Sequence, residues 1–173
     1  MVHSVEVLFD PDTEAAVRRS WDELSAAGSR SLAAHTAPSN RPHVTLAVAD
    51  QMDDAVDDAL RLALGALPFA CTIGAPMVFT GRALILVRLL VPSAELIDLH
   101  ATVHRLSLPH MPNGPLPHTD PGQWTPHVTL ARRVAPDQLS TALAVDSMSR
   151  DIRGSVVGLR HWDGNARVEH LIR

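Results

Sequence analysis

The chain has 173 residues, of which 46% are apolar and 20% charged, a composition typical of a folded globular protein rather than a disordered one. This length accommodates one compact domain or two small lobes that share a core. The net charge of −4 excludes a global basic field of the kind that holds long nucleic acid non-specifically. All 15 basic residues are arginine, which excludes a lysine Schiff base or a P-loop lysine.

Compartment and redox state follow from simple counts. The first ten residues include acids and lack a long apolar stretch, so they do not read as a signal peptide. No segment reaches the roughly 18 uninterrupted apolar residues of a membrane span. Cys71 is the single cysteine, which excludes an intrachain disulfide, and its apolar surroundings predict a core position. We therefore expect a cytoplasmic protein with no membrane contact and no obligate protein partner.

Apolar periodicity divides the first half of the chain into alternating strands and helices. A strand is expected at residues 2–9, and a loop at 26–41 follows the next helix. A second strand is expected at 43–49, and Asp50 is the expected cap of a second helix. The apolar faces of the two helices are Val17, Trp21 and Leu24, then Met52, Val56, Leu60, Ala63 and Leu67. In the second helix, Asp53, Asp54, Asp57 and Asp58 are expected to form a solvated face. Two strands at 69–79 and 83–91 end this half.

The second half repeats this order. Ser93 caps a predicted helix with Leu96, Leu99, Val103 and Leu106 on its buried side. Residues 109–122 are rich in proline and predict a long irregular loop, a feature that is often functional in compact domains. A strand follows at 127–133, and Pro136 opens a short helix that buries Leu139 and Leu143. Strands at 152–162 and 166–172 form a hairpin around Asp163-Gly164.

The repeat contains a literal sequence match. Residues 41–47 read RPHVTLA and residues 125–131 read TPHVTLA, identical at six of seven positions and about half the chain apart. The simplest architecture is a duplicated α+β unit in a single bilobal domain spanning residues 1–173, with a central cleft on a pseudo-twofold axis. Each lobe would hold an antiparallel sheet with helices packed outside it.

The repeated motif contains histidine and threonine side chains that are suited to catalysis. Residues two apart in a strand share a face, so His43 and Thr45 project together, as do His127 and Thr129. Two imidazoles and two hydroxyls facing each other suit a phosphodiester. A neutral histidine takes a proton from water, a protonated one donates to the leaving ribose oxygen, and the threonines bind the non-bridging oxygens. No metal or other cofactor is needed if imidazolium and hydroxyl donors stabilise the developing charge.

Other histidines are weaker candidates. His100-Ala101-Thr102 repeats the pattern inside a predicted helix, where residues two apart diverge by about 200° and do not share a phosphate. His100 and His104 have the i, i+4 spacing of a metal pair, but the sequence offers them no third ligand, and no metal site is expected. His118 and Thr119 lie in the long loop and are weak candidates for substrate contact. Most of the remaining histidines are expected to face solvent or to be satisfied by the backbone; they are His3, His35, His110, His161 and His170.

The two motifs resemble those of the two-histidine phosphoesterase superfamily, and most closely its branch of 2′-5′ RNA ligases and RNA 2′,3′-cyclic phosphodiesterases. The resemblance implies a bilobal α+β fold and hydrolysis of a ribose 2′,3′-cyclic phosphate. It also implies a phosphate-binding arginine five positions after the second motif histidine, which is Arg132. Strict alternation places Arg132 on the opposite face, so it requires a bulge or strand end, and Arg133 and Arg41 are the fallback candidates.

The expected substrate is an RNA 3′ end or a small nucleotide with a cyclic phosphate. Aromatic residues make up only 3% of the chain, which leaves Phe9, Trp124 and Trp162 as candidates for base stacking. Trp124, three residues before His127, is the best placed of them. Two alternatives remain open: a reversible 2′-5′ RNA ligase, and a non-catalytic module that binds a cyclic nucleotide or an RNA end.

Overall fold

The computed structural model describes residues 2–173 as an α+β fold with antiparallel strand pairing throughout. The strands are β1 (His3–Phe9), β2 (His43–Ala49), β3 (Phe69–Phe79), β4 (Leu84–Leu90), β5 (His127–Val134), β6 (Ile152–Asp163) and β7 (Val168–Ile172). The α-helices are α1 (Pro11–Ala26), α2 (Val56–Leu60), α3 (Ala94–Ser107) and α4 (Leu139–Leu143), with short 3-10 turns between elements. Within residues 2–173, every helix is too short or too polar to cross a membrane.

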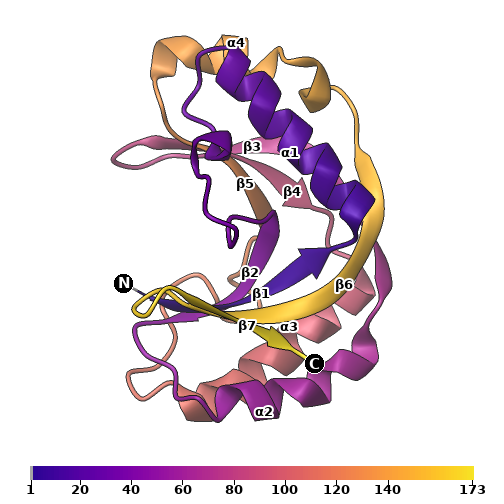
Figure 1. The fold of residues 1–173 in the computed structure, drawn as a ribbon, viewed down its shortest axis with the longest axis vertical. Helices are drawn as coiled ribbons and strands as arrows, with labels where there is room; N and C mark the ends of the chain where they lie inside the picture. Colours follow the sequence, from indigo (N-terminus) through magenta and orange to yellow (C-terminus); the bar gives the residue numbers. More distant parts are fainter. Residues whose placement is uncertain (1) are drawn as a thin grey trace.

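The strands form one hydrogen-bonded sheet of seven strands in the order β2-β1-β6-β3-β4-β5, with β7 also paired to β6. Long strand β6 joins the two lobes: its first part, from Ile152 to Val156, pairs with β3, and its remainder pairs with β1 and β7. Figure 1 shows β6 curving along one side, with β3, β4 and β5 above and β1, β2 and β7 below. The expected pair of separate sheets is therefore not confirmed, because β6 is long enough to belong to both lobes.

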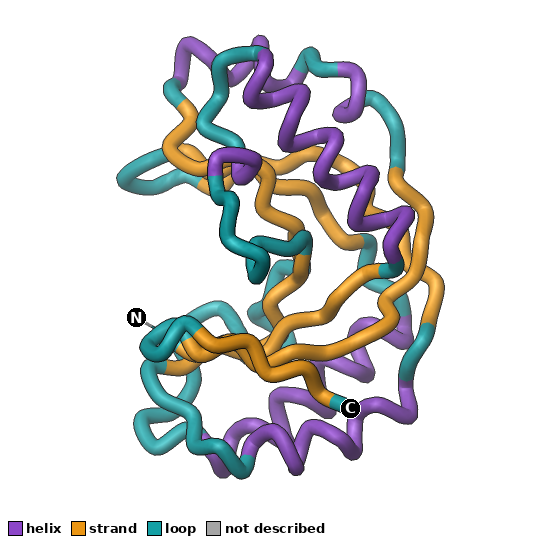
Figure 2. The backbone as a smooth tube through the Cα atoms, viewed as in Figure 1, coloured by secondary structure: helices purple, strands orange, loops and turns teal. Residues whose placement is uncertain are grey.

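The lobes also differ from the two halves of the sequence. Helix α1, from the first half, packs on β5 and β6, whereas α3, from the second half, packs on β2. In Figure 2 the helices lie in the outer parts of both lobes, and the strands run between them. Each motif strand is thus covered by a helix from the opposite half of the chain, so neither half forms a lobe alone.

Local signals explain most element boundaries. Asp10 caps α1 through hydrogen bonds from the backbone N–H groups of Asp12 and Thr13, and Ser93 caps α3 by accepting from Leu96. The expected apolar faces of these helices are buried, including Trp21 and Leu99. Cys71 also lies in the core, as expected, and burial raises the pKa of its thiol to about 11.

Three expectations in the helical segments are wrong. Asp50 does not cap a helix, because the chain makes a turn through residues 54–55 and α2 begins only at Val56 without a side-chain cap. Asp57 is half-buried rather than solvated, because it points toward the sheet. Leu143 is 39% exposed, because α4 is a single short helix that buries Ala142 instead.

Candidate active site

His43 and His127 are the first residues of β2 and β5, the two strands at opposite ends of the sheet order. The curved sheet brings these strands next to each other. Both imidazoles are half-buried, and the charge of His43 contributes to lowering the pKa of His127, which places the rings within electrostatic reach. A hollow of about 540 Å³ opens here and is lined by residues of both strands, among them Thr45 and His127. This volume lies in the range of small-molecule sites.

The two imidazoles are oriented in the same way. Nδ1 of His43 lies 2.7 Å from the carbonyl oxygen of Arg41, and Nδ1 of His127 lies 2.7 Å from that of Thr125. A carbonyl accepts only, so each Nδ1 carries the hydrogen. Nε2 of each ring is therefore the nitrogen left for acid-base chemistry, as an acceptor when neutral and a donor when protonated.

Each motif strand contains a bulge one residue after the threonine. In β2 the register passes from Thr45 to Ala47 and leaves Leu46 without a partner, and in β5 it passes from Thr129 to Ala131 and leaves Leu130 without one. A bulge resets the alternation of side chains. Val48, five residues after His43, consequently lines the hollow.

Arg132 stands in the position on β5 that Val48 holds on β2. The bulge at Leu130 supplies the change of face that the sequence argument required, and the charge of Arg132 contributes to lowering the pKa of His127. Arg133 is exposed, with a φ of 57°. Arg41 is held by two hydrogen bonds to Glu14 and lines a separate shallow hollow beside Arg18.

A buried ion pair borders His43. Arg160 Nε donates to Glu6 Oε2 at 2.7 Å, and both side chains are at most 5% exposed. The same carboxylate oxygen lies 3.6 Å from His43 Nδ1, and Arg160 also pairs with Glu169. Burial acts to raise the pKa of Glu6, but the charges of His43 and Arg160 and the hydrogen bonds from Ser4 and Arg160 hold this pKa below its ordinary value. Glu6 is therefore ionised beside His43.

His127 lies in a different environment. Burial lowers the pKa of His127 below its ordinary value, and the charges of His43 and Arg132 act in the same direction. The hydrogen bond to Thr125 opposes them without reversing the result. The Phe79 ring meets the imidazole edge to face, with 4.7 Å between centroids. These neighbours favour a neutral imidazole.

The aromatic residues divide between the cleft and the core. Trp124 lines the hollow, while one face of its indole is stacked on His100 with ring centroids 3.9 Å apart. Phe9 is only 1% exposed and belongs to the core, so its proposed stacking role is wrong. Trp162 lies on β6 near the guanidinium of Arg160. Phe79, which sequence reasoning missed, also lines the hollow.

The proline-rich loop before β5 contributes a wall of the hollow. Pro117, His118 and Thr119 line it, as does Gln123. His118 has a φ of 69°, a conformation that few residues other than glycine adopt, and the loop is held there by the hydrogen bond between His100 Nε2 and the carbonyl oxygen of Thr119.

Glu6 and Arg160 were not predicted as site residues from the sequence. Their only sequence signal is a charged residue inside an apolar strand. His3 and His161 are exceptions to the expectation for most of the remaining histidines, because both are buried and hydrogen-bonded to side chains.

Comparison with known proteins agrees with this geometry. Residues 11–163 match the model of the 2′-5′ RNA ligase superfamily. The chain belongs to this superfamily, the two-histidine phosphoesterases. No curated protein matches the chain in sequence.

Solved structures of three proteins share the fold of this superfamily member at low sequence identity. TT0787 of Thermus thermophilus is 17% identical, with a TM-score of 0.62 over 100% of this chain and 96% of that one. LigT of E. coli is 14% identical, with a TM-score of 0.61 over 99% and 94%. Usb1 of Kluyveromyces marxianus is 14% identical, with a TM-score of 0.60 over 99% and 97%.

Proposed function

We propose that this superfamily member hydrolyses ribose 2′,3′-cyclic phosphates, on a nucleotide or an RNA 3′ end, through His43 and His127. The observation that carries the proposal is the matched orientation of the two rings, each with Nδ1 on a backbone carbonyl and Nε2 available. Usb1 has been solved with uridine monophosphate and LigT with 3′-AMP, which supports a nucleotide-sized ligand. The hollow of about 540 Å³ is consistent with that size.

The unlike surroundings of the two histidines assign their roles in this proposal. Neutral His127 accepts a proton from water through Nε2 as the water oxygen bonds to phosphorus. His43, with ionised Glu6 beside its Nδ1, carries the proton that Nε2 donates to the departing ribose oxygen. The bond between phosphorus and that oxygen breaks and leaves a phosphate monoester. Proton exchange with solvent then restores both rings.

Thr45, Thr129 and Arg132 are the proposed phosphate contacts. The threonine hydroxyls donate to non-bridging oxygens, and the Arg132 guanidinium offers a charged, planar set of donors. Together they hold phosphorus in line with the water that His127 activates. Trp124, Phe79 and the 117–119 segment form the walls against which a ribose and base would lie.

The test is hydrolysis of the four nucleoside 2′,3′-cyclic monophosphates and of a short RNA ending in a cyclic phosphate. Wild type, His43→Ala and His127→Ala are compared in EDTA, with folding checked by circular dichroism in the same buffer. We expect turnover in wild type and a loss of at least about 100-fold in each variant. Turnover that survives either substitution would contradict the paired mechanism. Ligand-induced stabilisation of wild type with no product would instead identify a binding module.

A further inference from the structure

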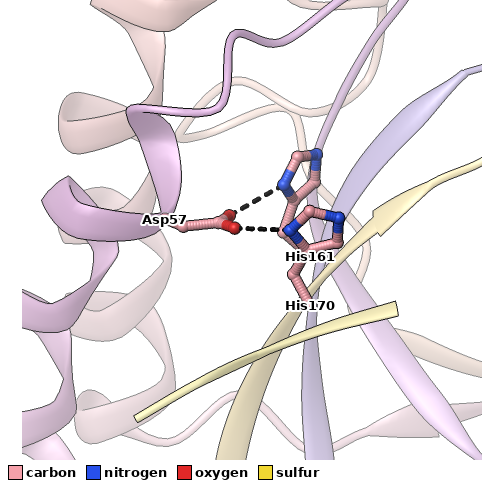
Figure 3. A group of neighbouring side chains, drawn as sticks. All are labelled: Asp57, His161 and His170. Atoms are coloured by element: carbon pink, nitrogen blue, oxygen red, sulfur yellow. Dashed lines mark hydrogen bonds and ion pairs between the residues drawn. The ribbon is translucent and has the colours of Figure 1, made fainter. Parts of the chain in front are cut away.

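A cluster of three side chains lies outside the cleft, where α2 meets the C-terminal hairpin. Asp57 of α2 stands between two histidines, with Oδ1 2.8 Å from Nδ1 of His161 and Oδ2 2.7 Å from Nδ1 of His170 (Figure 3). One ligand atom of each residue lies within 4.8 Å of those of the other two. The three residues come from α2, β6 and β7.

This cluster is separate from the catalytic residues. Neighbouring residues on β6 project to opposite faces, so Arg160 reaches Glu6 and His43 while His161 points toward α2. His161 is 1% exposed, whereas the His170 side chain is 33% exposed and leaves a route from solvent. The three ligand atoms thus lie on the helix side of the sheet.

Polar contacts continue behind His161, first a hydrogen bond to His3 and then a contact between His3 and Asp163. Nε2 of His161 lies 3.0 Å from Nδ1 of His3, and Nε2 of His3 lies 3.4 Å from a carboxylate oxygen of Asp163. If His161 donates from Nδ1 to Asp57, its Nε2 is an acceptor and His3 must donate from Nδ1. A neutral His3 then presents a lone pair to the Asp163 carboxylate. With both imidazoles neutral, two acceptors therefore face each other at His3 Nε2 and Asp163.

A metal ion on Nδ1 of His161 removes the mismatch. The hydrogen of His161 then sits on Nε2 and is donated to His3, whose own Nε2–H then faces the Asp163 carboxylate. Metal-ligating histidines are commonly oriented by such a hydrogen bond from the second ring nitrogen.

We infer that Asp57, His161 and His170 form a binding site for a divalent transition-metal ion of the zinc class. Two imidazoles and one carboxylate suit Zn²⁺ or Co²⁺ better than Mg²⁺ or Ca²⁺, which prefer oxygen ligands. With bonds of about 2.0 to 2.1 Å, ligand atoms in a tetrahedral zinc site stand roughly 3.3 Å apart, so only small side-chain shifts are needed. The half-exposed side of His170 leaves the fourth position to water.

The ion would stabilise the contact between α2 and the C-terminal hairpin. Helix α2 has only five residues and no side-chain cap, and β7 is the short strand that ends the sheet on that side. One ion joining α2, β6 and β7 would stabilise the C-terminal hairpin against local opening.

The test measures Co²⁺ and Zn²⁺ binding to the metal-stripped full chain, by cobalt visible absorption and by the shift in Tm. We expect one bound ion per chain, a tetrahedral cobalt spectrum, and a rise in Tm with Zn²⁺ but not with Mg²⁺. His170→Ala and Asp57→Asn, both at partly exposed positions, should weaken binding at least about 100-fold.

Two control variants locate the ion. His110→Ala removes a histidine from another aspartate pair, its Nδ1 lying 2.8 Å from Asp53, and should leave binding unchanged. His127→Ala should also leave it unchanged, because the cleft is a separate site. Failure of wild type to bind either ion, binding that survives His170→Ala, or binding lost in His127→Ala would each overturn the inference. All these readouts are independent of catalytic turnover.

Discussion

Trp21 and Trp124 make the same hydrogen bond to the two motif strands. The Trp21 indole N–H donates to the carbonyl oxygen of Thr129 at 3.1 Å, and the Trp124 indole N–H donates to that of Thr45 at 2.9 Å. Each bond fixes the backbone at the motif threonine, next to the bulge. Each motif strand is therefore held by a side chain far away in sequence.

Replacing the indole of Trp21 or Trp124 should destabilise the motif strand that it contacts. Trp21→Phe and Trp124→Phe each remove a donor from a part-buried carbonyl, and we expect each to lower the free energy of unfolding by about 1 to 2 kcal/mol. Urea denaturation followed by circular dichroism measures the change. Trp162→Phe, at a half-exposed indole, is the comparison and should cost less than about 0.5 kcal/mol. Equal effects at all three positions would argue against a specific role for the two hydrogen bonds.

The pH dependence of hydrolysis should report on His127. Its pKa is lowered chiefly by burial, so the neutral base persists below the ordinary histidine pKa of 6.5. We expect the acid limb of kcat/KM to have its midpoint below pH 6.5, with activity lost as pH falls through the lowered pKa. Removing the neighbouring charge in Arg132→Ala should move that midpoint upward. An acid limb with the same midpoint in Arg132→Ala and in wild type would contradict the electrostatic effect of Arg132 on the pKa of His127.

Arg132 and Arg133 offer a matched pair of substitutions. A charged hydrogen bond to phosphate is worth about 1.5 to 3 kcal/mol, so Arg132→Ala should lower kcat/KM by roughly 10- to 100-fold. Arg133→Ala, one residue further along the same strand, should change it less than threefold. Steady-state kinetics on one nucleoside cyclic phosphate decides between them. The reverse order of effects would assign the phosphate contact to Arg133.

The buried ion pair of Glu6 and Arg160 borders His43, and we expect it to contribute to the stability of the fold as well. Glu6→Gln removes one carboxylate partner from the buried Arg160 guanidinium. We expect this substitution to lower the free energy of unfolding by about 3 kcal/mol. Glu14→Gln, in the more exposed pair with Arg41, should cost about 1 kcal/mol or less.

The sign of the pH effect follows from the lowered pKa of Glu6. Above the ordinary carboxyl pKa of 4.5, wild type should be more stable than Glu6→Gln by the full amount. This difference in unfolding free energy should be lost as pH falls through the lowered pKa of Glu6 in the folded protein. Unfolding free energies measured across this range provide the check. An advantage that is constant with pH would contradict the ionised state of Glu6.

Much of the fold and of the site's composition could be predicted from local patterns. The Ser93 cap, the two motif strands and the apolar faces of α1 and α3 depend on residues close together in the chain. The shared face of His43 and Thr45 likewise needs only the two-residue period of a strand. The helix expected after Asp50 failed, because Met52 and Val56 could be buried without a continuous helix joining them.

Tertiary structure decided the relations between distant residues. The length of β6 merged two expected sheets into one, and the bulge at Leu130 set the face of Arg132. The differing surroundings of His43 and His127 depend on Glu6 and Arg160, which are far from the motifs in sequence. A seven-residue motif repeated almost unchanged determined which groups could perform the chemistry. The asymmetry between the two copies came only from the side chains that pack around them, because burial and charge depend on neighbours in space.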